Sequence, residues 1–281
     1  MGQERIIHAA LLGAGTVGSG VYKLVKDLEE EIISKTGARL VVDKILVRDT
    51  TKAREGIPSE LLIDRWDEIL NDPQIEIVIE VMGGIRPALT WLEEALRAGK
   101  QVVTANKDLL AEYGEQLFDA AEAGKCDLHF EAAVAGAIPI IRPLRQSLVA
   151  SELTEVMGIV NGTTNYILTR MTEDGMGYEE ALALATKLGY AESDPTADVE
   201  GYDAGRKVAI MASIAFNSNV TFSQVYTEGI THITAEDIRY AKEFGYVIKL
   251  IGMTRLTEGG VEVKVHPMLL PEQHPLSTVR D

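Results

Sequence analysis

Residues 6–25, IIHAALLGAGTVGSGVYKLV, indicate the fold of the first half of the chain. An apolar run leads into three glycines at GxGxxG spacing, and helical spacing follows from about Val17 to Ile33. Glycines at this spacing allow a sharp turn, close approach of a pyrophosphate and close helix packing, and the helix N-terminus offers free amides to phosphate. The pattern predicts a strand, turn and helix that bind a dinucleotide, with a ligand-free turn as the alternative. The candidate contacts are Gly13, Gly15, Thr16, Val17 and Gly18.

The second predicted strand, RLVVDKILVRD at residues 39–49, ends on two charged residues. In folds of this kind the cofactor's ribose is selected at this strand end. Asp49 would favour the 2′-hydroxyl of NAD, whereas Arg48, helped by Lys52, would favour the 2′-phosphate of NADP. The residues leave the choice open and favour NADP, with Arg48 as the candidate phosphate ligand.

Two more strands follow, IEIVIEV at residues 75–81 and QVVTANK at residues 101–107. The first leads through MGGIRPA into a helix with Pro87 in its first turn. Strands and helices alternating in this way indicate an α/β fold with a doubly wound, Rossmann-like parallel sheet, whose ligands bind beyond the carboxyl ends of the strands. Gly84, Thr104 and Lys107 lie at those ends and are candidate cofactor contacts.

A helix at about residues 111–123 and the strand DLHFEA, residues 127–132, lead to VAGAIPII. Glu131 is an acid at the end of this strand. The carbonyls of the residues after it could join it around a hard cation, which prefers oxygen ligands. From spacing alone, a capping or hinge acid is the favoured interpretation.

The alternation of strands and helices ends near Ala150, which predicts a dinucleotide-binding domain at residues 1–149 and a second, α+β domain at residues 150–281. VMGIVNGTTNYILTRM, from Val156, predicts a strand, a polar turn and a helix. Further predictions are a helix at residues 178–188, a capping pair of Thr234 and Asp237, and a hairpin that turns at residues 258–260.

The stretch GYAESDPTADVEGYDAGRK, residues 189–207, carries five acids and then two bases. Pro195 and Gly201 predict a loop that holds Glu192 and Asp198, and helical spacing begins at Asp203. At about 100° per residue, Asp203 and Lys207 fall inside the apolar stripe of this helix. Because an unpaired buried charge is costly, they must line a pocket or pair with each other. We expect the chemistry here, with a purely structural ion pair as the alternative.

The composition, 46% hydrophobic and 25% charged in 281 residues, is that of a globular chain with room for two cores. A net charge of −16 disfavours binding to nucleic acid or anionic membranes and favours small-molecule substrates. A single cysteine, Cys126, and an N-terminal apolar run too short to span a membrane predict a cytoplasmic protein.

Seven motifs resemble the homoserine dehydrogenase family in order and spacing: GAGTVG, GGIRPA, TANK, EAAVAGAIPII, GIVNGTTNYIL, LGYAESDPTADVEGYDAGRK and HPLS. The resemblance runs from about Ile7 onward, and the acidic stretch ending at Lys207 is its most specific part. It implies reversible NAD(P)-dependent oxidation of L-homoserine to L-aspartate 4-semialdehyde, in the route to threonine and methionine. It also implies that the second domain binds substrate and forms a homodimer.

The resemblance further implies roles for single residues. Lys207 would move the hydroxyl proton as general acid/base, because an alcohol must lose this proton as hydride departs. Lys107 would lie beside the substrate and the nicotinamide, and Gly189 near the cofactor. The other substrate contacts would be Glu192, Asp198, Asp203 and Tyr190. A sodium ion would be held by Glu131 and the carbonyls of Val134, Gly136 and Ile138, which rests on the resemblance and not on spacing.

Members of this family normally continue beyond the position of Asp281, with a segment that completes the second sheet and, in many, a regulatory domain. The hairpin ending near His266 is therefore expected to lack a neighbouring strand, and the chain to be less stable and less active than a longer one, without threonine feedback through that domain. Another amino-acid dehydrogenase, such as one acting on aspartate, and a nucleotide-binding sensor stay open as alternatives. The acidic stretch and Lys207 favour homoserine dehydrogenase.

Overall fold

The computed structural model describes residues 4–280, and the chain divides into two compact units, Met1–Ala137 and Ile138–Asp281. This division lies earlier than the predicted boundary between residues 149 and 150. The physical reason is the π-helical turn Pro143–Ser147, which packs against the helix Tyr202–Ala215 of the second unit.

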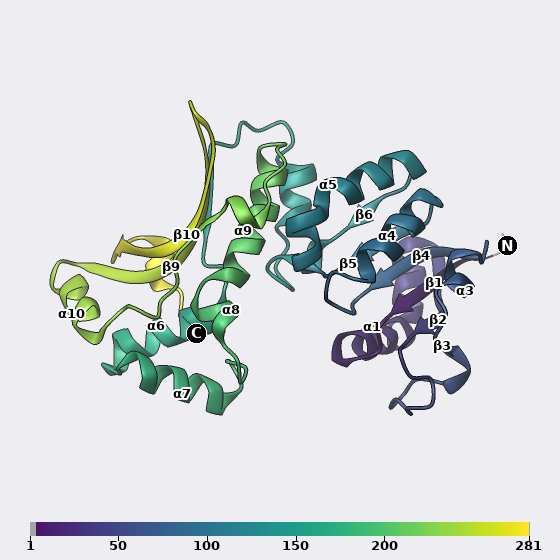
Figure 1. The fold of residues 1–281 in the computed structure, drawn as a ribbon, viewed down its shortest axis with the longest axis horizontal. Helices are drawn as coiled ribbons and strands as arrows, with labels where there is room; N and C mark the ends of the chain where they lie inside the picture. Colours follow the sequence, from purple (N-terminus) through teal and green to yellow (C-terminus); the bar gives the residue numbers. More distant parts are fainter. Residues whose placement is uncertain (1–3, 281) are drawn as a thin grey trace. The chain divides into compact units, whose positions relative to one another are not determined.

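The first unit is built on a parallel sheet of six strands in the order β3-β2-β1-β4-β5-β6 (Figure 1). The strands are β1 (Arg5–Leu12), β2 (Ala38–Leu46), β3 (Leu62–Ile63), β4 (Ile75–Glu80), β5 (Gln101–Thr104) and β6 (Leu128–His129). The last four residues of β1 are all fully buried, which requires cover on both faces because neighbouring side chains point to opposite sides. This order confirms the doubly wound sheet, with its topological switch point between β1 and β4.

The helices of this unit are α1 (Thr16–Asp27), α2 (Glu29–Thr36), α3 (Asp67–Leu70), α4 (Ala88–Arg97) and α5 (Lys107–Gly124). α1 and α2 contact β2, whereas α4 and α5 lie side by side (Figure 1). The single helix expected up to about Ile33 is wrong, because Leu28 departs from helical geometry (φ −108°, ψ 22°) between α1 and α2. α5 begins earlier than expected because the side chain of Asn106 caps it, accepting from the backbone N–H of Leu109 at 3.2 Å.

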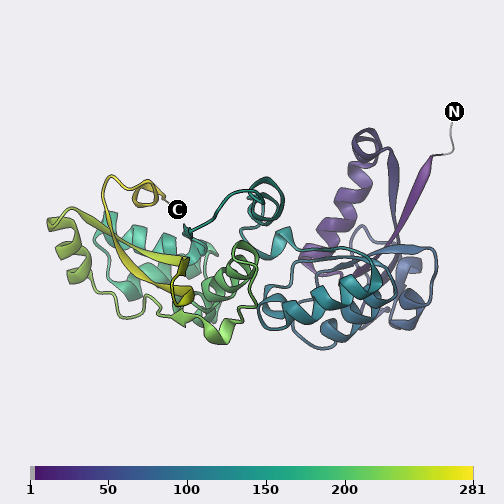
Figure 2. The same cartoon turned by 90° about the horizontal axis from the view of Figure 1, so that it is seen from above.

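The second unit contains a mixed sheet of four strands in the order β7-β9-β10-β8. The strands are β7 (Glu155–Gly158), β8 (Tyr226–Thr227), β9 (Tyr246–Thr257) and β10 (Gly260–Pro271). β9 and β10 form the expected antiparallel hairpin, a long twisted ribbon in yellow-green and yellow (Figure 2). β8 pairs with Lys264 and Val265 of β10, so the expectation of an edge without a neighbour near His266 is wrong for this part. Farther along β10, Pro267 and Pro271 lack donor N–H groups, which weakens the edge as a template for pairing.

The helices of the second unit are α6 (Gly162–Asp174), α7 (Tyr178–Leu188), α8 (Thr196–Val199), α9 (Tyr202–Ala215) and α10 (Ala235–Glu243). α6 and α7 lie side by side (Figure 1), and α9 contacts both strands of the hairpin. The prediction that Asp198 lies on a loop is wrong, because it is part of α8. This turn forms after Pro195, where a carboxylate oxygen of Asp194 accepts from the backbone N–H of Thr196 at 3.1 Å.

Among residues 4–280, no helix combines the length and the apolar character that crossing a membrane requires.

Candidate functional site

The glycine turn after β1 has the geometry that a pyrophosphate needs. Gly13 has a φ of +101°, which residues with a Cβ rarely adopt. A Cβ added to Gly18 would lie 2.1 Å from the carbonyl oxygen of Gly13, so a side chain there would clash. A Cβ on Gly15 would meet nothing within 4 Å, so the backbone there is open to a ligand. Thr16 and Val17 follow in the first turn of α1, where backbone N–H groups lack helical partners. The residues present therefore fit a dinucleotide.

Arg48 and Asp49 follow β2, and both are exposed, but Asp49 is bonded within the loop that it begins. One carboxylate oxygen of Asp49 accepts from the hydroxyl (2.6 Å) and the backbone N–H (2.9 Å) of Thr51. These bonds hold the pKa of Asp49 below its usual value, and the bond from the hydroxyl has the larger effect. The Arg48 guanidinium makes no hydrogen bond or ion pair within residues 4–280. Of the two charges at this strand end, Arg48 is therefore the one available to a ligand.

A buried network joins the loops that follow β4 and β5. Glu80 is 0% exposed and accepts from the backbone N–H groups of Met82 (2.8 Å) and Gly83 (3.1 Å) and from the hydroxyl of Thr104 (2.6 Å). The amide of Asn106 donates to the carbonyl of Gly84 at 2.6 Å. The network thus ties Thr104, the last residue of β5, to the loop that follows β4, and the hydroxyl of Thr104 is turned into the protein.

Lys107 is the first residue of α5, directly after the capping Asn106, and its side chain is half-buried. The sequence predicted this position at a strand end but missed Glu80 and Asn106. Both left a signal: Glu80 is an acid at the end of a mostly apolar strand, and Asn106 directly precedes a helix.

The loop proposed for sodium begins with Glu131 in a 3-10 turn, Glu131–Ala133, just after β6. Ala135 (φ +50°) and Ala137 (φ +68°) both adopt left-handed backbone geometry, which costs energy for residues with a Cβ. Val134 and Gly136 lie at the alternate positions, and Ile138 follows with 68% of its surface exposed. Strained backbone of this kind is found where a loop presents its carbonyls or amides for binding, and carbonyl oxygens fit the donor set of a hard cation.

Four side chains of the acidic stretch and the NGTTN turn meet in the second unit. Lys207 donates to Asp203 at 2.6 Å and to the carbonyl of Val160 at 2.8 Å. The amide of Asn161 donates to Asp198 at 2.7 Å and to the same oxygen of Asp203 at 3.0 Å. Of the two outcomes left open for Asp203 and Lys207, lining a pocket or pairing with each other, the structure shows the pair. We call Asp198, Asn161, Asp203 and Lys207 the acid–amide–lysine cluster.

The cluster is shielded but not closed. The side chains of Lys207 and Asp203 are 18% and 12% exposed, so both are withdrawn from bulk water yet still within reach of a small molecule. Within residues 4–280, Lys207 makes two hydrogen bonds, which leaves one of its three ammonium hydrogens for another acceptor. One oxygen of Asp198 likewise accepts no hydrogen bond from any described residue. In such a site the carboxylates can accept hydrogen bonds from a substrate ammonium, and the amine can exchange a proton with a hydroxyl.

The other residues predicted for this site lie on the exposed segment between α7 and α8. Gly189 is the left-handed cap of α7 (φ +83°). Tyr190 stacks on Tyr166 of α6 with ring centroids 4.6 Å apart, and its carbonyl accepts from Thr163 at 2.8 Å. Glu192 is exposed and makes no bond within residues 4–280, so the structure does not join it to the cluster.

Asn161 was not predicted as a functional residue. The signal was its place in a polar turn between a predicted strand and a predicted helix. Its bonds to Asp198 and Asp203 join residues 37 and 42 positions away, and such pairings do not follow from sequence spacing.

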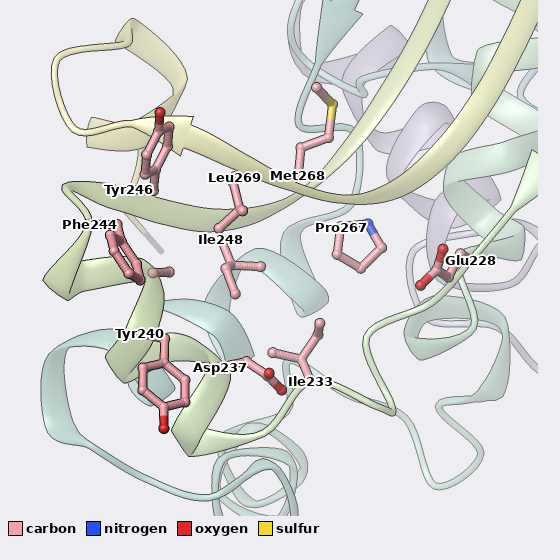
Figure 3. A pocket seen from close by; sticks show the side chains of 11 residues that line it. Glu228, Ile233, Asp237, Tyr240, Phe244, Tyr246, Ile248, Pro267, Met268 and Leu269 are labelled. Carbon is pink, nitrogen blue, oxygen red and sulfur yellow. The ribbon is translucent and has the colours of Figure 1, made fainter.

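A separate pocket of about 850 Å³ lies between α10 and the ends of β9 and β10 (Figure 3). Its walls are mainly apolar, with Phe244, Ile248 and Leu269 among the side chains that line it. Its two carboxylates already have partners, because Asp237 accepts from Thr234 and Glu228 accepts from the hydroxyl of Tyr226. It shares no residue with the acid–amide–lysine cluster.

Two family models match the chain. The model described as homoserine dehydrogenase covers residues 139–281, and the one described as homoserine dehydrogenase, NAD binding domain, covers residues 13–131. Homoserine dehydrogenase of Bacillus subtilis (strain 168) is 47% identical over 278 residues, which are 99% of this chain and 64% of that protein. The chain thus spans less than two thirds of the length of this curated relative.

Solved structures agree with the sequence comparison. A homoserine dehydrogenase from Thiobacillus denitrificans superposes with a TM-score of 0.92 at 44% identity, covering 98% of this chain and 64% of that one. A putative homoserine dehydrogenase from Archaeoglobus fulgidus gives a TM-score of 0.84 at 34% identity, covering 98% and 87%. Since both halves of the chain match models of one family, and the match over residues 139–281 alone covers more than half of the chain, the chain belongs to the homoserine dehydrogenase family.

Proposed function

We propose that this chain catalyses the reversible NAD(P)-dependent oxidation of L-homoserine to L-aspartate 4-semialdehyde. The observation that carries the proposal is the acid–amide–lysine cluster. In it a shielded lysine with a free hydrogen-bonding position pairs with Asp203, and the amide of Asn161 links that carboxylate to the carboxylate of Asp198. Homoserine offers matching groups, an ammonium for the carboxylates and a hydroxyl for the lysine. Membership in the family supports the same reaction.

The chemistry needs one proton acceptor. When the alcohol is oxidised, the carbon that bears the hydroxyl gives up a hydride and the oxygen gives up its proton. The neutral amine of Lys207 takes that proton, and in the reverse direction the ammonium returns it. Asp203 orients the amine through its 2.6 Å bond, and Asp198 and Asp203 hold the substrate's amino group. The other proposed substrate contacts, Glu192, Tyr190 and Lys107, rest on the family resemblance.

The proposed cofactor is NADP, with NAD as the alternative. The nicotinamide, when bound, accepts or supplies the hydride. The turn at Gly13, Gly15 and Gly18 fits the pyrophosphate, and Arg48 is free to bind a 2′-phosphate while one oxygen of Asp49 is engaged by Thr51. Gly84 and Lys107 would contact the cofactor at the ends of β4 and β5, and Gly189 and the backbone of Thr104 are further contacts that the family suggests.

A sodium ion is proposed for the loop after β6, held by the carboxylate of Glu131 and the carbonyls of Val134, Gly136 and Ile138. The donor set is all oxygen, which suits a hard cation, and the left-handed backbone at Ala135 and Ala137 supports a role in binding. The ion would fix the loop rather than take part in proton transfer.

A homodimer and a cytoplasmic location are also proposed. The dimer rests on the family resemblance, and light scattering of the purified chain tests it. The location rests on the single cysteine, because a chain with one cysteine forms no internal disulfide.

The test of the reaction is a substrate screen. The purified chain is mixed with NADP or NAD and either L-homoserine or L-aspartate, and formation of reduced cofactor is followed by absorbance. We expect reduction with homoserine and none with aspartate. Reduction with aspartate alone would identify another amino-acid dehydrogenase, and cofactor binding without turnover of either substrate would identify a sensor.

A further inference from the structure

Asn161 lies at the centre of the acid–amide–lysine cluster. It is 6% exposed and stands in the turn between β7 and α6, next to Val160, whose carbonyl accepts from Lys207. Its amide reaches Asp198 of α8 and Asp203 of α9 at 2.7 and 3.0 Å. One side chain therefore connects three separate segments at the place where substrate would be held.

The orientation of the Asn161 amide is fixed by its neighbours. The backbone N–H of Thr164 can only donate, so the oxygen of the amide must face it, and that bond is 2.9 Å long. The hydroxyl of Thr164 bonds to the same oxygen at 2.9 Å. The NH₂ group then has to face the two carboxylates, one hydrogen for each. Both hydrogens of the Asn161 NH₂ group and its amide oxygen are therefore engaged in hydrogen bonds at the same time.

Two roles fit these bonds. The first is that of a helix cap for α6, which needs only the oxygen of Asn161. The second needs the NH₂ group: two carboxylates that share one amide repel each other, and a donor between them offsets that repulsion and fixes their spacing. Since Asp203 also orients Lys207, the same donor acts on the lysine through Asp203.

We propose that Asn161 is a positioning residue, whose amide holds Asp198 and Asp203 at the spacing that a substrate ammonium requires and keeps Asp203 in place for Lys207. The proposal deepens the proposed function and rests on it for the identity of the substrate. The proposed substrate site then contains an amide donor, Asn161, in addition to its carboxylates and its lysine.

The variant Asn161→Asp separates the two roles. Aspartate caps helices as well as asparagine does and suits a helix N-terminus electrostatically, so a residue that only caps would leave stability and activity unchanged. If the NH₂ group matters, the variant places a third carboxylate beside two others. We then expect a lower unfolding temperature at neutral pH. The deficit should shrink at acid pH, because protonation relieves the repulsion among three neighbouring carboxyls. Within residues 4–280, charged side chains that bond to this turn include Asp198 of α8 and Asp203 and Lys207 of α9.

Turnover gives the second measurement. For Asn161→Asp we expect kcat/KM for homoserine to fall by about tenfold to a hundredfold, the effect of losing a hydrogen bond to a charged group, with cofactor affinity unchanged. Asn161→Ser is the matched variant, because serine also caps helices but adds no charge and cannot reach both carboxylates. It should unfold closer to wild type and still lose turnover, and it decides the question if Asn161→Asp does not fold.

The two proposals can fail separately. If wild type does not oxidise homoserine, the proposed function is wrong, and the unfolding of Asn161→Asp at the two pH values still decides the role of the amide. If Asn161→Asp unfolds at the wild-type temperature or above, or if either variant keeps kcat/KM within about twofold of wild type, Asn161 is only a cap.

Discussion

Lys207 stands between the carboxylate of Asp203 and the carbonyl of Val160, and its third hydrogen points to no acceptor within residues 4–280. A lysine that served structure alone could have all its donors engaged by the protein. Lys249 is that case, since it is buried and donates to the side chains of Asn165 and Thr169 and to the carbonyl of Val279. The free position on Lys207 is what makes it a candidate for proton transfer.

Replacing Lys207 with methionine keeps most of the side-chain length and removes the amine. We expect kcat for homoserine oxidation to fall by about 10² or more, as for the loss of a positioned proton-transfer group, while cofactor affinity stays at the wild-type level. Steady-state kinetics and fluorescence titration of the cofactor measure both. The exposed Lys242→Met on α10 is the control. A Lys207→Met chain with most of the wild-type kcat would remove Lys207 from the mechanism.

Arg48 tests cofactor choice. Arg48→Ala should weaken NADP binding by about tenfold to a hundredfold, the worth of one charge-assisted contact, and leave NAD binding nearly unchanged, because only NADP carries the 2′-phosphate. Calorimetric titration with each cofactor measures the difference. Arg65→Ala is the control, since Arg65 is exposed and pairs with Glu68 just before α3. Equal losses for both cofactors would show that Arg48 does not bind the phosphate.

At the scale of helices and strands, the sequence predicted local patterns well and junctions poorly. The parallel strands follow from apolar runs between glycines, and the capping box of Thr234 and Asp237 is confirmed at both bonds. The break at Leu28 was missed because the residues around it keep helical spacing and charge. The turn α8 was missed because four residues are too few to show a period. Asn161 was missed because its partners come together only in the folded chain.

The loops after β4 and β5 depend on one buried hydroxyl. Thr104→Val keeps the shape of the side chain but leaves an oxygen of Glu80 and the N–H of Asn106 without this partner. We expect the free energy of unfolding to fall by about 1–3 kcal/mol, the cost of unsatisfied buried polar groups. Urea unfolding checks this. Thr90→Val, at an exposed position on α4, should change the value by no more than about 0.5 kcal/mol. Equal effects at the two positions would contradict the role of the network.

The capping box of α10 predicts a pH dependence. Hydrogen bonds from Thr234 lower the pKa of Asp237 below its usual 3.8. The bond from the Thr234 hydroxyl has the largest effect, and the bond from its backbone N–H has the next largest. A lowered pKa in the folded state stabilises the protein above the usual value, and this contribution is lost as pH falls through the folded value. Asp237→Asn should therefore be less stable than wild type at pH 7.

The deficit of Asp237→Asn should close as the pH falls below 3.8, because wild-type Asp237 then becomes neutral too. Urea unfolding between neutral and acid pH measures the deficit. Glu236→Gln removes a charge from the same turn without touching the capping box and serves as the control. A deficit that stays constant over this range would show that ionised Asp237 does not stabilise the helix end.

At the scale of the whole chain, the two units carry different parts of the proposed reaction. Met1–Ala137 holds the glycine turn and the loops that fit a dinucleotide, and Ile138–Asp281 holds the cluster that we propose binds homoserine. The sequence predicted both parts from motifs, and one family model matches residues 13–131 while another matches residues 139–281. Hydride transfer requires the cofactor and the substrate to react directly with each other. Activity of the chain would therefore show that the two units act together.

The origin of the hydride is the most direct test of the proposed reaction. The chain is incubated with NADP and homoserine carrying deuterium at both positions of the carbon that bears the hydroxyl, and the products are analysed by mass spectrometry. We expect one deuterium in the reduced cofactor, one retained in the aldehyde, and equal amounts of the two products. Reduced cofactor without deuterium, or no cofactor reduction while both ligands bind, would contradict the assignment of this chain as a homoserine-oxidising enzyme.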